Sequence, residues 1–382
     1  MKHIKRALIV ATVGRFLDFE KNDIKLLQSM GYQVYCAANF EMDEEDKSSI
    51  SGMDVIKCQV DFARTPLSAS NIRAYKQLCQ LMQKEHFDLV HCHTPVGGVV
   101  ARLVAAKYRK EGTKVLYTAH GFHFYEGAPL KNWLFFYPIE WICSWLTDVQ
   151  ITINGEDYKR AKKRFHAKKV VYVPGVGINT NQFTCGNIDV DVKREQLNLG
   201  KENIMLLSVG ELSPRKNHEV VIRALARLKN PTIRYFVCGT GDLEESLKGL
   251  VHKQGLDQQV VFLGYRSDIS ELCQATDLYI FPSKQEGLPV ALMEAIACKT
   301  PVICSDIRGN NDLVSNSTDM FKAEDVDGLV RCMESKLGNG TREILFANMQ
   351  SNVDENYRNL KNFELINVEK EMREIYEGCK TL

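Results

Sequence analysis

Short apolar runs alternate along this chain with longer stretches that carry apolar residues every three or four positions. The first run, residues 6–12 (Arg-Ala-Leu-Ile-Val-Ala-Thr), predicts a buried strand, and the stretch from Glu20 to Met30 predicts a helix that ends at Gly31. Further strands are expected at residues 33–37, 54–60, 88–92, 114–118, 149–153 and 169–173. This alternation is typical of a parallel doubly wound sheet, so the chain is expected to be an α/β protein.

The alternation breaks at residues 174–183, where the turn-rich sequence Pro-Gly-Val-Gly-Ile-Asn-Thr-Asn-Gln-Phe suits a hinge. A second set of strands is expected at residues 204–209, 233–238, 260–262, 278–281 and 302–304. Only helical patterns follow, and the last of them, residues 363–379, offers an apolar packing face. The pattern therefore predicts two Rossmann-like domains, residues 1–177 and residues 178–361.

The composition excludes several classes of protein. With 382 residues the chain is long enough for two domains that each bury a core, and its net charge of +1 gives no reason to expect nucleic acid as a partner. No stretch reaches the roughly 18 to 20 apolar residues of a membrane-spanning helix, and the N-terminus carries no apolar signal segment. The 12 cysteines lack paired spacing, which fits free thiols in the cytoplasm. No Gly-x-Gly-x-x-Gly follows the first strand, which disfavours a dinucleotide oxidoreductase.

Two glutamates frame the start of a predicted helix in the second half of the chain. Glu286 lies just before the helix, and Glu294 lies about two turns further along. Pro289 is expected in the first helical turn, so the amides of Gly287 and Leu288 come where backbone N–H groups lack partners within the helix. Such a helix start attracts anions and hydroxyls. The two carboxylates could hold two parts of one ligand, although two solvated glutamates are the ordinary interpretation of this spacing.

Arg215 and Lys216 follow the first strand of the second domain and precede a helix. Cations in this position can bind an anion, and each charge-assisted hydrogen bond contributes roughly 1.5–3 kcal/mol. An isolated Arg-Lys pair could equally be a solvated helix start. Gly239 and Gly241 end the next strand, where glycine lets the backbone approach a ligand closely.

The spacing Glu-x7-Glu within Glu-Gly-Leu-Pro-x4-Glu-Ala resembles the nucleotide-sugar site of the family-four retaining GT-B glycosyltransferases. In that family the first glutamate contacts the transferred sugar and the second contacts the nucleotide ribose, which implies these roles for Glu286 and Glu294. The resemblance also implies that Arg215 and Lys216 grip the two phosphates of the donor. His120, in the segment Ala-His-Gly-Phe-His-Phe-Tyr, resembles the histidine beside the transferred sugar; the alternative is a buried core imidazole.

Further segments resemble parts of the family's donor site. Gly14 matches a glycine loop that passes near the donor phosphate, although this chain has Val13 where many relatives have a second glycine. Tyr265 and Arg266 fall where the backbone of these enzymes reads the base edge, and a plain turn is the alternative. The segment 306–314 matches only loosely and is given no chemical role.

The resemblance covers nearly the whole chain and implies the GT-B fold. Two Rossmann-like domains then face one cleft, and the last helix, residues 362–382 here, crosses back to the first domain. The segments His-Cys-His-Thr-Pro at residues 91–95 and Ala-His-Gly-Phe-His-Phe-Tyr at residues 119–125 are most similar to bacterial exopolysaccharide and capsule glycosyltransferases.

The reaction implied is transfer of a hexose-type sugar from a nucleoside diphosphate donor, expected to be UDP, to a polyprenyl-diphosphate-linked saccharide with anomeric retention. No well-placed carboxylate on the acceptor side suggests a double displacement, so front-face substitution is favoured. Catalysis is assigned to His120, Glu286, Arg215 and Lys216, with no cofactor besides the nucleotide-sugar co-substrate. Two alternatives stay open: a UDP-sugar 2-epimerase of the same architecture, and an inactive nucleotide-sugar-binding scaffold.

No metal site is expected. Residues 91–93 (His-Cys-His) lie on a strand, where neighbouring side chains point to opposite faces, and no CxxC or HxxxH partner accompanies them. His93, at the end of this strand, is expected to line the cleft. The Asp-Val-Asp sequences at residues 189–191 and 325–327 follow no strand of a nucleotide cradle and are expected to be solvated loops.

Aliphatic and aromatic side chains crowd residues 129–146, where Pro138 is expected to interrupt any continuous helix. Residues 159–169 are strongly basic. Aromatic residues beside basic ones suit an anionic lipid surface, and a core helix next to a solvated charged helix explains the pattern equally well. We expect a cytoplasmic protein whose first domain touches the inner face of the membrane peripherally.

Overall fold

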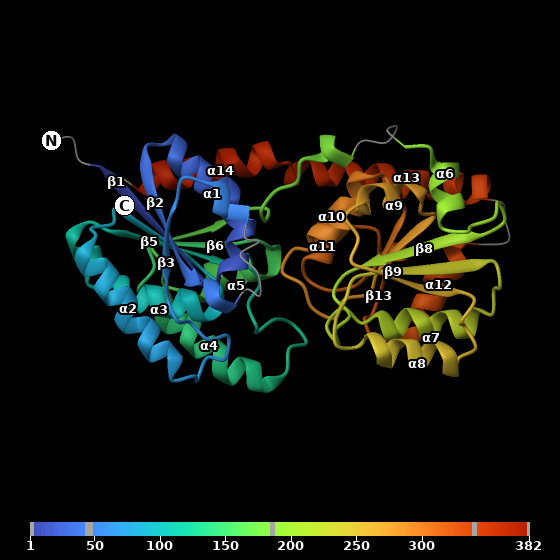
Figure 1. Ribbon diagram of the computed structural model, residues 1–382, viewed down its shortest axis with the longest axis horizontal. Coiled ribbons are helices and arrows are strands. Elements are labelled where there is room, and N and C mark those ends of the chain that lie inside the picture. The colour runs from blue at the N-terminus through green and yellow to red at the C-terminus, as the bar shows by residue number, and fades with distance from the viewer. Residues whose placement is uncertain (1–3, 43–48, 184–187, 338–341, 380–382) are drawn as a thin grey trace. The chain divides into compact units, whose positions relative to one another are not determined.

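The computed structural model describes residues 4–42, 49–183, 188–337 and 342–379, and the chain forms two compact units. The first unit comprises Met1–Gly177 and Leu365–Leu382, and the second comprises Ile178–Glu364. Each unit contains a parallel β-sheet with helices on both faces (Figure 1), which confirms the predicted α/β class.

The first unit is built on a seven-stranded sheet in the order β3-β2-β1-β4-β5-β6-β7, and its paired strands are parallel. The strands are β1 (Lys5–Val13), β2 (Tyr32–Asn39), β3 (Ile56–Gln59), β4 (Leu89–His93), β5 (Lys114–Ala119), β6 (Val149–Thr152) and β7 (Lys169–Tyr172). The strand order reverses between β1 and β4. In doubly wound sheets, ligands bind outside the carboxyl ends of the strands at such a switch point.

Helices cover both faces of this sheet and bury two apolar cores. One core packs α2 and α3 against the sheet, and the other packs α1 and α14 against the opposite face. The helices of the first unit are α1 (Lys21–Ser29), α2 (Ser70–Lys84), α3 (Pro95–Ala105), α4 (Leu130–Ser144), α5 (Gly155–Arg164) and α14 (Leu365–Gly378). A 3-10 helix, η1 (Gly14–Glu20), connects β1 to α1.

The last helix, α14, is fixed to the first unit beside α1 (Figure 1) by a buried chain of hydrogen bonds. The hydroxyl of Tyr376 donates to Asp23 on α1 at 2.9 Å and lies 2.9 Å from Nδ1 of His91 on β4. Oγ1 of Thr118 lies 2.8 Å from His91 Nε2. Burial, and to a lesser extent the charge of His120, lowers the pKa of His91 to about 3. The neutral ring therefore donates through Nδ1 to Tyr376 and accepts from Thr118 through Nε2.

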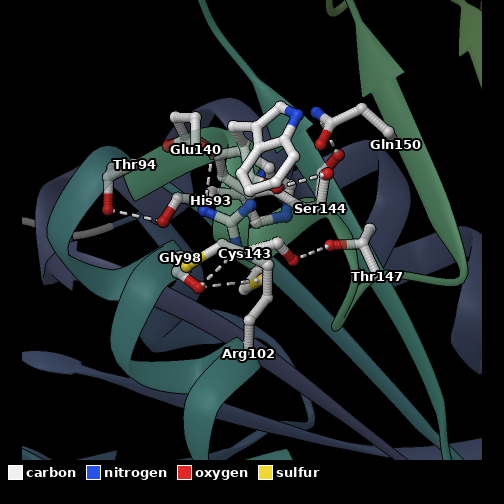
Figure 2. A network of polar contacts seen from close by, with 12 residues as sticks. His93, Thr94, Gly98, Arg102, Glu140, Cys143, Ser144, Thr147 and Gln150 are labelled. Atoms are coloured by element: carbon white, nitrogen blue, oxygen red, sulfur yellow. Dashed lines mark hydrogen bonds and ion pairs between the residues drawn. The ribbon is translucent and has the colours of Figure 1, made fainter. Parts of the chain in front are cut away.

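A second buried network joins α3 to α4 (Figure 2). Arg102 on α3 donates to Glu140 Oε2 on α4 at 2.8 Å, and the hydroxyl of Tyr117 donates to the other carboxylate oxygen at 3.1 Å. The guanidinium carbon of Arg102 lies 3.8 Å from the centre of the Tyr117 ring. Helix α4 runs unbroken through Pro138, so the predicted interruption is wrong. Proline removes one helical hydrogen bond, and the packing of α4 on α3 outweighs that local cost.

The second unit is built on a six-stranded sheet in the order β10-β9-β8-β11-β12-β13. Its strands are β8 (Ile204–Val209), β9 (Ile233–Cys238), β10 (Val260–Gly264), β11 (Leu278–Phe281), β12 (Val302–Ser305) and β13 (Met320–Phe321). Its helices are α6 (Val190–Gln196), α7 (His218–Leu228), α8 (Glu244–Lys253), α9 (Ile269–Ala275), α10 (Val290–Ala297), α11 (Asn310–Leu313), α12 (Val326–Leu337) and α13 (Arg342–Leu360). The strand order reverses between β8 and β11, which places the switch point of this unit there.

Candidate functional site

The loops that follow β8 and β11 meet at the switch point of the second sheet. These two strands are paired in parallel, so both loops leave from the same edge. The backbone N–H of Lys284, after β11, donates to the carbonyl of Arg215, after β8, at 2.8 Å. This contact places Arg215 and Lys216 opposite Glu286.

Three of the predicted site residues form one ionic cluster in this position. Nη1 of Arg215 and Nζ of Lys216 each lie 2.8 Å from the same oxygen of Glu286, Oε1. The side chain of Arg215 is 43% exposed, whereas that of Glu286 is 10% exposed. Two cations on one carboxylate leave a net positive charge, and the exposed guanidinium can donate to further oxygens. The cluster can therefore bind an anion such as a diphosphate.

A third loop, after β12, supports Glu286 and was not predicted to have a role. Nε of Arg308 donates to the backbone carbonyl of Glu286 at 3.1 Å. Gly309 has a φ of +81°, and a Cβ atom there would lie 2.4 Å from the carbonyl oxygen of Gly287. Glycine is thus required both by the backbone conformation and by the close approach. The segment 306–314 positions the turn that carries Glu286 and Gly287.

Helix α10 begins after this turn. Pro289 is its N-cap, with extended backbone (φ −84°, ψ 109°), so the prediction that it lies in the first helical turn is wrong by one position. Gly287 and Leu288 lie in the turn before the helix. Glu294 is half-buried on α10, and burial raises the pKa of its carboxyl group. Hydrogen-bond donors such as ribose hydroxyls would offset the desolvation of this carboxylate.

The close approach that Gly239 and Gly241 permit is to the chain itself. A Cβ atom on Gly239 would lie 2.0 Å from the carbonyl oxygen of Gly210, and one on Gly241 would lie 2.6 Å from that of Leu212. Both contacts fall at the base of the loop that carries Arg215. The two glycines therefore let the β8 and β9 loops pack together and position Arg215, and their direct approach to a ligand stays a prediction.

Tyr265 and Arg266 follow β10, next to β9 in the sheet. The side chain of Tyr265 is exposed, and the guanidinium of Arg266 donates to both oxygens of Asp268 at 2.7 and 2.5 Å. The bond from Arg266 lowers the pKa of Asp268 well below its usual range. This ion pair occupies the guanidinium of Arg266, whereas the ring of Tyr265 stays exposed, and a role of this segment in reading the base edge stays a prediction.

A second polar cluster forms at the switch point of the first sheet. Nδ1 of His93 lies 3.1 Å from Nε2 of His120, and Oε1 of Glu20 lies 3.3 Å from each of these nitrogens. His93 is the last residue of β4, His120 directly follows β5, and Glu20 ends η1 after β1; these three strands are neighbours in the sheet. His120 and His93 were expected near this edge, whereas Glu20 was expected only to begin a helix. Gly14, the first residue of η1, is buried beside the end of β1.

The backbone next to His93 is strained. Thr94 has a φ of 61° and a ψ of 152°, a conformation that residues with a side chain rarely adopt. Its hydroxyl donates to the carbonyl of His93 at 2.5 Å (Figure 2) and lies 2.7 Å from the hydroxyl of Thr12 on β1. Phe16 of η1 packs edge-on against His120, with ring centres 4.8 Å apart. Such strain persists where the surroundings fix the residue, and it is common at functional sites.

The first unit also exposes apolar and basic side chains on neighbouring segments. Exposed apolar residues of α4 and its end are Leu130, Leu134, Trp141, Ile142 and Trp145. Trp145 stacks on His166, which follows α5, with ring centres 4.0 Å apart. Exposed basic residues of α5 are Lys159, Lys162, Lys163 and Arg164. Among the described residues, no helix is both long and apolar enough to cross a membrane.

Comparisons with known proteins agree with this two-unit organisation. Residues 8–152 match the family described as glycosyl transferase 4-like, and residues 189–359 match the glycosyl transferases of group 1. The putative glycosyltransferase EpsD of Bacillus subtilis is 38% identical to this chain over 322 residues, which are 83% of each protein. The UDP-Gal:alpha-D-GlcNAc-diphosphoundecaprenol alpha-1,3-galactosyltransferase of Escherichia coli is 27% identical over 307 residues, 78% of each protein.

Solved structures with the same architecture include HepE of Anabaena in complex with UDP and glucose, with a TM-score of 0.78, 18% identity and complete coverage of both chains. Sucrose-phosphate synthase from Thermosynechococcus elongatus has a TM-score of 0.74 at 17% identity and covers 98% of each chain. These similarities establish the GT-B fold. Together with the identity to EpsD, they show that the chain belongs to the glycosyltransferases that pair a 4-like first domain with a group 1 second domain.

Proposed function

We propose that this glycosyltransferase moves a hexose-type sugar from a nucleoside diphosphate, UDP, to a lipid-linked saccharide in the synthesis of a bacterial surface polysaccharide. The observation that carries the proposal is the cluster of Arg215, Lys216 and Glu286 at the switch point of the second sheet. It combines the positive charge that a diphosphate needs with a carboxylate for sugar hydroxyls.

In the proposed reaction the bond between the anomeric carbon and the phosphate oxygen breaks, and the acceptor oxygen bonds to the same face of that carbon. The negative charge of the leaving diphosphate collects beside Arg215 and Lys216, which stabilise it in the transition state without a metal ion at the phosphates. The acceptor proton passes to the leaving phosphate oxygen. Glu286 orients the sugar, and Glu294 accepts from the ribose.

Retention by front-face substitution fits the carboxylates available. A double displacement requires a carboxylate that can reach the anomeric carbon. Glu20 lies beside His120, the residue proposed to contact the sugar, but its side chain is 5% exposed and its Oε1 faces two imidazoles. It is therefore poorly placed to act as a nucleophile.

The choice of donor and acceptor is supported by what related proteins bind. HepE was solved with UDP and glucose, and the name of the galactosyltransferase from Escherichia coli specifies a UDP-sugar donor and a diphosphoundecaprenol acceptor. The test is a screen of UDP-sugars against a polyprenyl-diphosphate-linked saccharide. Each donor is supplied separately, so product mass shows which UDP-sugar is used, and the NMR coupling of the anomeric proton gives the configuration.

Incubation with the donor alone separates this reaction from its alternatives. A UDP-sugar 2-epimerase would change the donor without an acceptor, and an inactive scaffold would bind UDP-sugar without any turnover. Formation of a new glycosidic bond only when donor and acceptor are both present is the result expected here.

We also propose that the first unit contacts an anionic membrane surface from the cytoplasm. Exposed Leu130, Leu134 and Trp145 could enter the interface while Lys162 and Lys163 approach anionic head groups. Flotation with vesicles that contain phosphatidylglycerol is expected to carry the wild-type protein, and high salt should weaken its binding. Lys162→Glu combined with Lys163→Glu should abolish flotation, whereas Lys248→Glu on α8 should not. Absence of the wild-type protein from the lipid fraction at all salt concentrations would contradict this proposal.

A further inference from the structure

Three potential metal-ligand atoms lie close together in the first unit, one each from Glu20, His93 and His120. The three separations are nearly equal, at 3.1, 3.3 and 3.3 Å. Zinc ligands at about 2.0–2.1 Å in tetrahedral geometry lie roughly 3.3–3.4 Å apart from one another. An ion slightly out of the plane of these three atoms would therefore contact all of them at normal distances.

Hydrogen bonds alone leave this arrangement incomplete. A neutral imidazole offers a single N–H. The nitrogen atoms of the two histidines and Oε1 of Glu20 form a triangle. One N–H directed into this triangle can form only one good hydrogen bond. If both rings directed an N–H into it, the two hydrogen atoms would repel each other. Oε1 of Glu20 is buried and has no hydrogen-bond partner among the described residues. A cation at the centre would satisfy all three atoms at once.

The elements that carry the three residues are rigid. His93 ends β4, His120 directly follows β5, and Glu20 ends η1 after β1. Paired strands fix the separation of the two histidines, and the packing of Phe16 against His120 fixes the ring. A metal site needs this degree of order in its ligands before the ion arrives.

Room for a further ligand lies next to the triangle. Glu20 and His120 line a cavity of about 30 Å³ together with Phe19, Asp23 and Thr118, which is enough for one or two water molecules. A site with three protein ligands and one open position is typical of ions that bind an exchangeable oxygen ligand.

We propose that Glu20, His93 and His120 bind one divalent transition-metal ion of the zinc type, with the remaining coordination position open to this cavity. Two imidazoles and one carboxylate suit zinc and other first-row divalent ions and are poor ligands for magnesium. The site lies in the first unit and is separate from the phosphate cluster of the second. The ion would bind Nε2 of His120. The proposed contact with the sugar would then be made by other atoms of the ring.

The test measures metal binding by the full chain without donor or acceptor, so its outcome is independent of the proposed reaction. Protein stripped with a chelator is titrated with Zn²⁺ and, separately, with Co²⁺. We expect saturation at about one equivalent per chain, and intense visible absorption of the Co²⁺ form that indicates tetrahedral coordination.

Variants localise the site. His120→Ala removes a partly exposed ligand and should fold, and Glu20→Gln keeps the side-chain shape. Each is expected to weaken Zn²⁺ binding at least about tenfold. His252→Gln is the matched control, since His252 on α8 forms an exposed pair with Asp257 and should bind no structural ion. Failure of the folded wild-type protein to bind either ion, or equal binding by wild type and both ligand variants, would overturn the proposal.

Discussion

The two sheets present very different chemistry at the same topological position. At the switch point of the second sheet, Arg215 and Lys216 converge on Glu286 and keep a partly exposed positive charge. At the switch point of the first, Glu20 meets two imidazoles, and His93 is fully buried. The same strand order therefore supports a charged anion site in one unit and a compact, buried cluster of potential ligands in the other.

The difference arises from the residues that lie at or just after the carboxyl ends of the strands. A guanidinium and an ammonium remain charged when partly exposed, and they suit phosphate oxygens. A buried imidazole loses its proton and becomes an acceptor or a metal ligand. The fold supplies the edge, and the residues after β1, β4 and β5 or after β8 and β11 decide what that edge can bind.

The largest expected effect is a loss of turnover, and it tests the cations at the edge of the second sheet. Lys216→Ala removes one of the two cations and should lower turnover by roughly 10²–10³-fold, because the departing diphosphate loses a positioned donor. The measurement is kcat with the best donor found in the screen, with circular dichroism to confirm the fold. Lys248→Ala is the control, since Lys248 pairs with glutamates on the exposed surface of α8. Near wild-type turnover by Lys216→Ala would remove Lys216 from the mechanism.

Gly309→Ala tests whether the β12 loop positions Glu286. The new Cβ atom would collide with the carbonyl of Gly287, and displacement of this turn should lower kcat/KM by roughly ten- to a hundredfold. Gly255→Ala is the matched control, because Gly255 also has positive φ (+68°) but nothing lies within 4 Å of its Cβ position. Equal losses in both variants would mean that backbone strain alone explains the effect.

Glu294→Gln addresses nucleotide binding by α10. Loss of a charged acceptor for ribose hydroxyls should weaken UDP affinity by about tenfold, and kcat at saturating donor should change less. Calorimetric titration with UDP measures the first quantity. Unchanged affinity would place the ribose elsewhere.

The smallest expected effect is the change in the stability of each unit as the pH falls. Burial lowers the pKa of His91 in the first unit to about 3 and that of His218 in the second to about 4. Both histidines accept protons near pH 6.5 when unfolded, so stability is present above that pH and is lost as the pH falls toward these lower values. Each histidine should therefore cost its unit at most roughly 1.4 kcal/mol per pH unit below pH 6.5. In the first unit Asp23 opposes this loss, because burial raises the pKa of its carboxyl group to about 8 and the folded state then gains a proton as the pH falls. The contribution of His91 is therefore the difference between the wild type and His91→Gln.

Hydrogen exchange at pH 7, 5 and 4, read separately for peptides of each sheet, measures this difference. His91→Gln should make the first unit lose less stability between pH 7 and pH 4 than the wild type does, although not none, because burial also lowers the pKa of His93 there. It should leave the second unit unchanged. No difference between His91→Gln and the wild type in the first unit, or an equal difference in both units, would contradict the assignment.

Patterns within the chain predicted most of the fold. The predicted strands through residue 304 are present. Most of them, such as β1 and β8, are buried apolar runs, which are easily separated from amphipathic helices. Strand β13 was not predicted, because it has only two residues and so shows no periodicity. The continuity of α4 through Pro138 could not be read locally, since it depends on the contacts of α4 with α3.

The candidate site was predicted where its residues lie in segments that resemble a known family. Arg215, Lys216 and Glu286 were expected to act together, and they form one cluster. Glu20 was missed because its partners, His93 and His120, lie at the ends of strands that become its neighbours only in the folded sheet. The role of Arg308 is equally invisible in the sequence, because it acts through a backbone carbonyl of a distant loop.

The position of α14 has a consequence for how the protein is made. Tyr376 completes the buried chain to Asp23 and His91, so the first unit lacks part of its core until α14 has been synthesised. Domains usually fold in order as they leave the ribosome. Here all residues of the second unit precede α14, so the second unit can fold while one face of the first sheet is still uncovered.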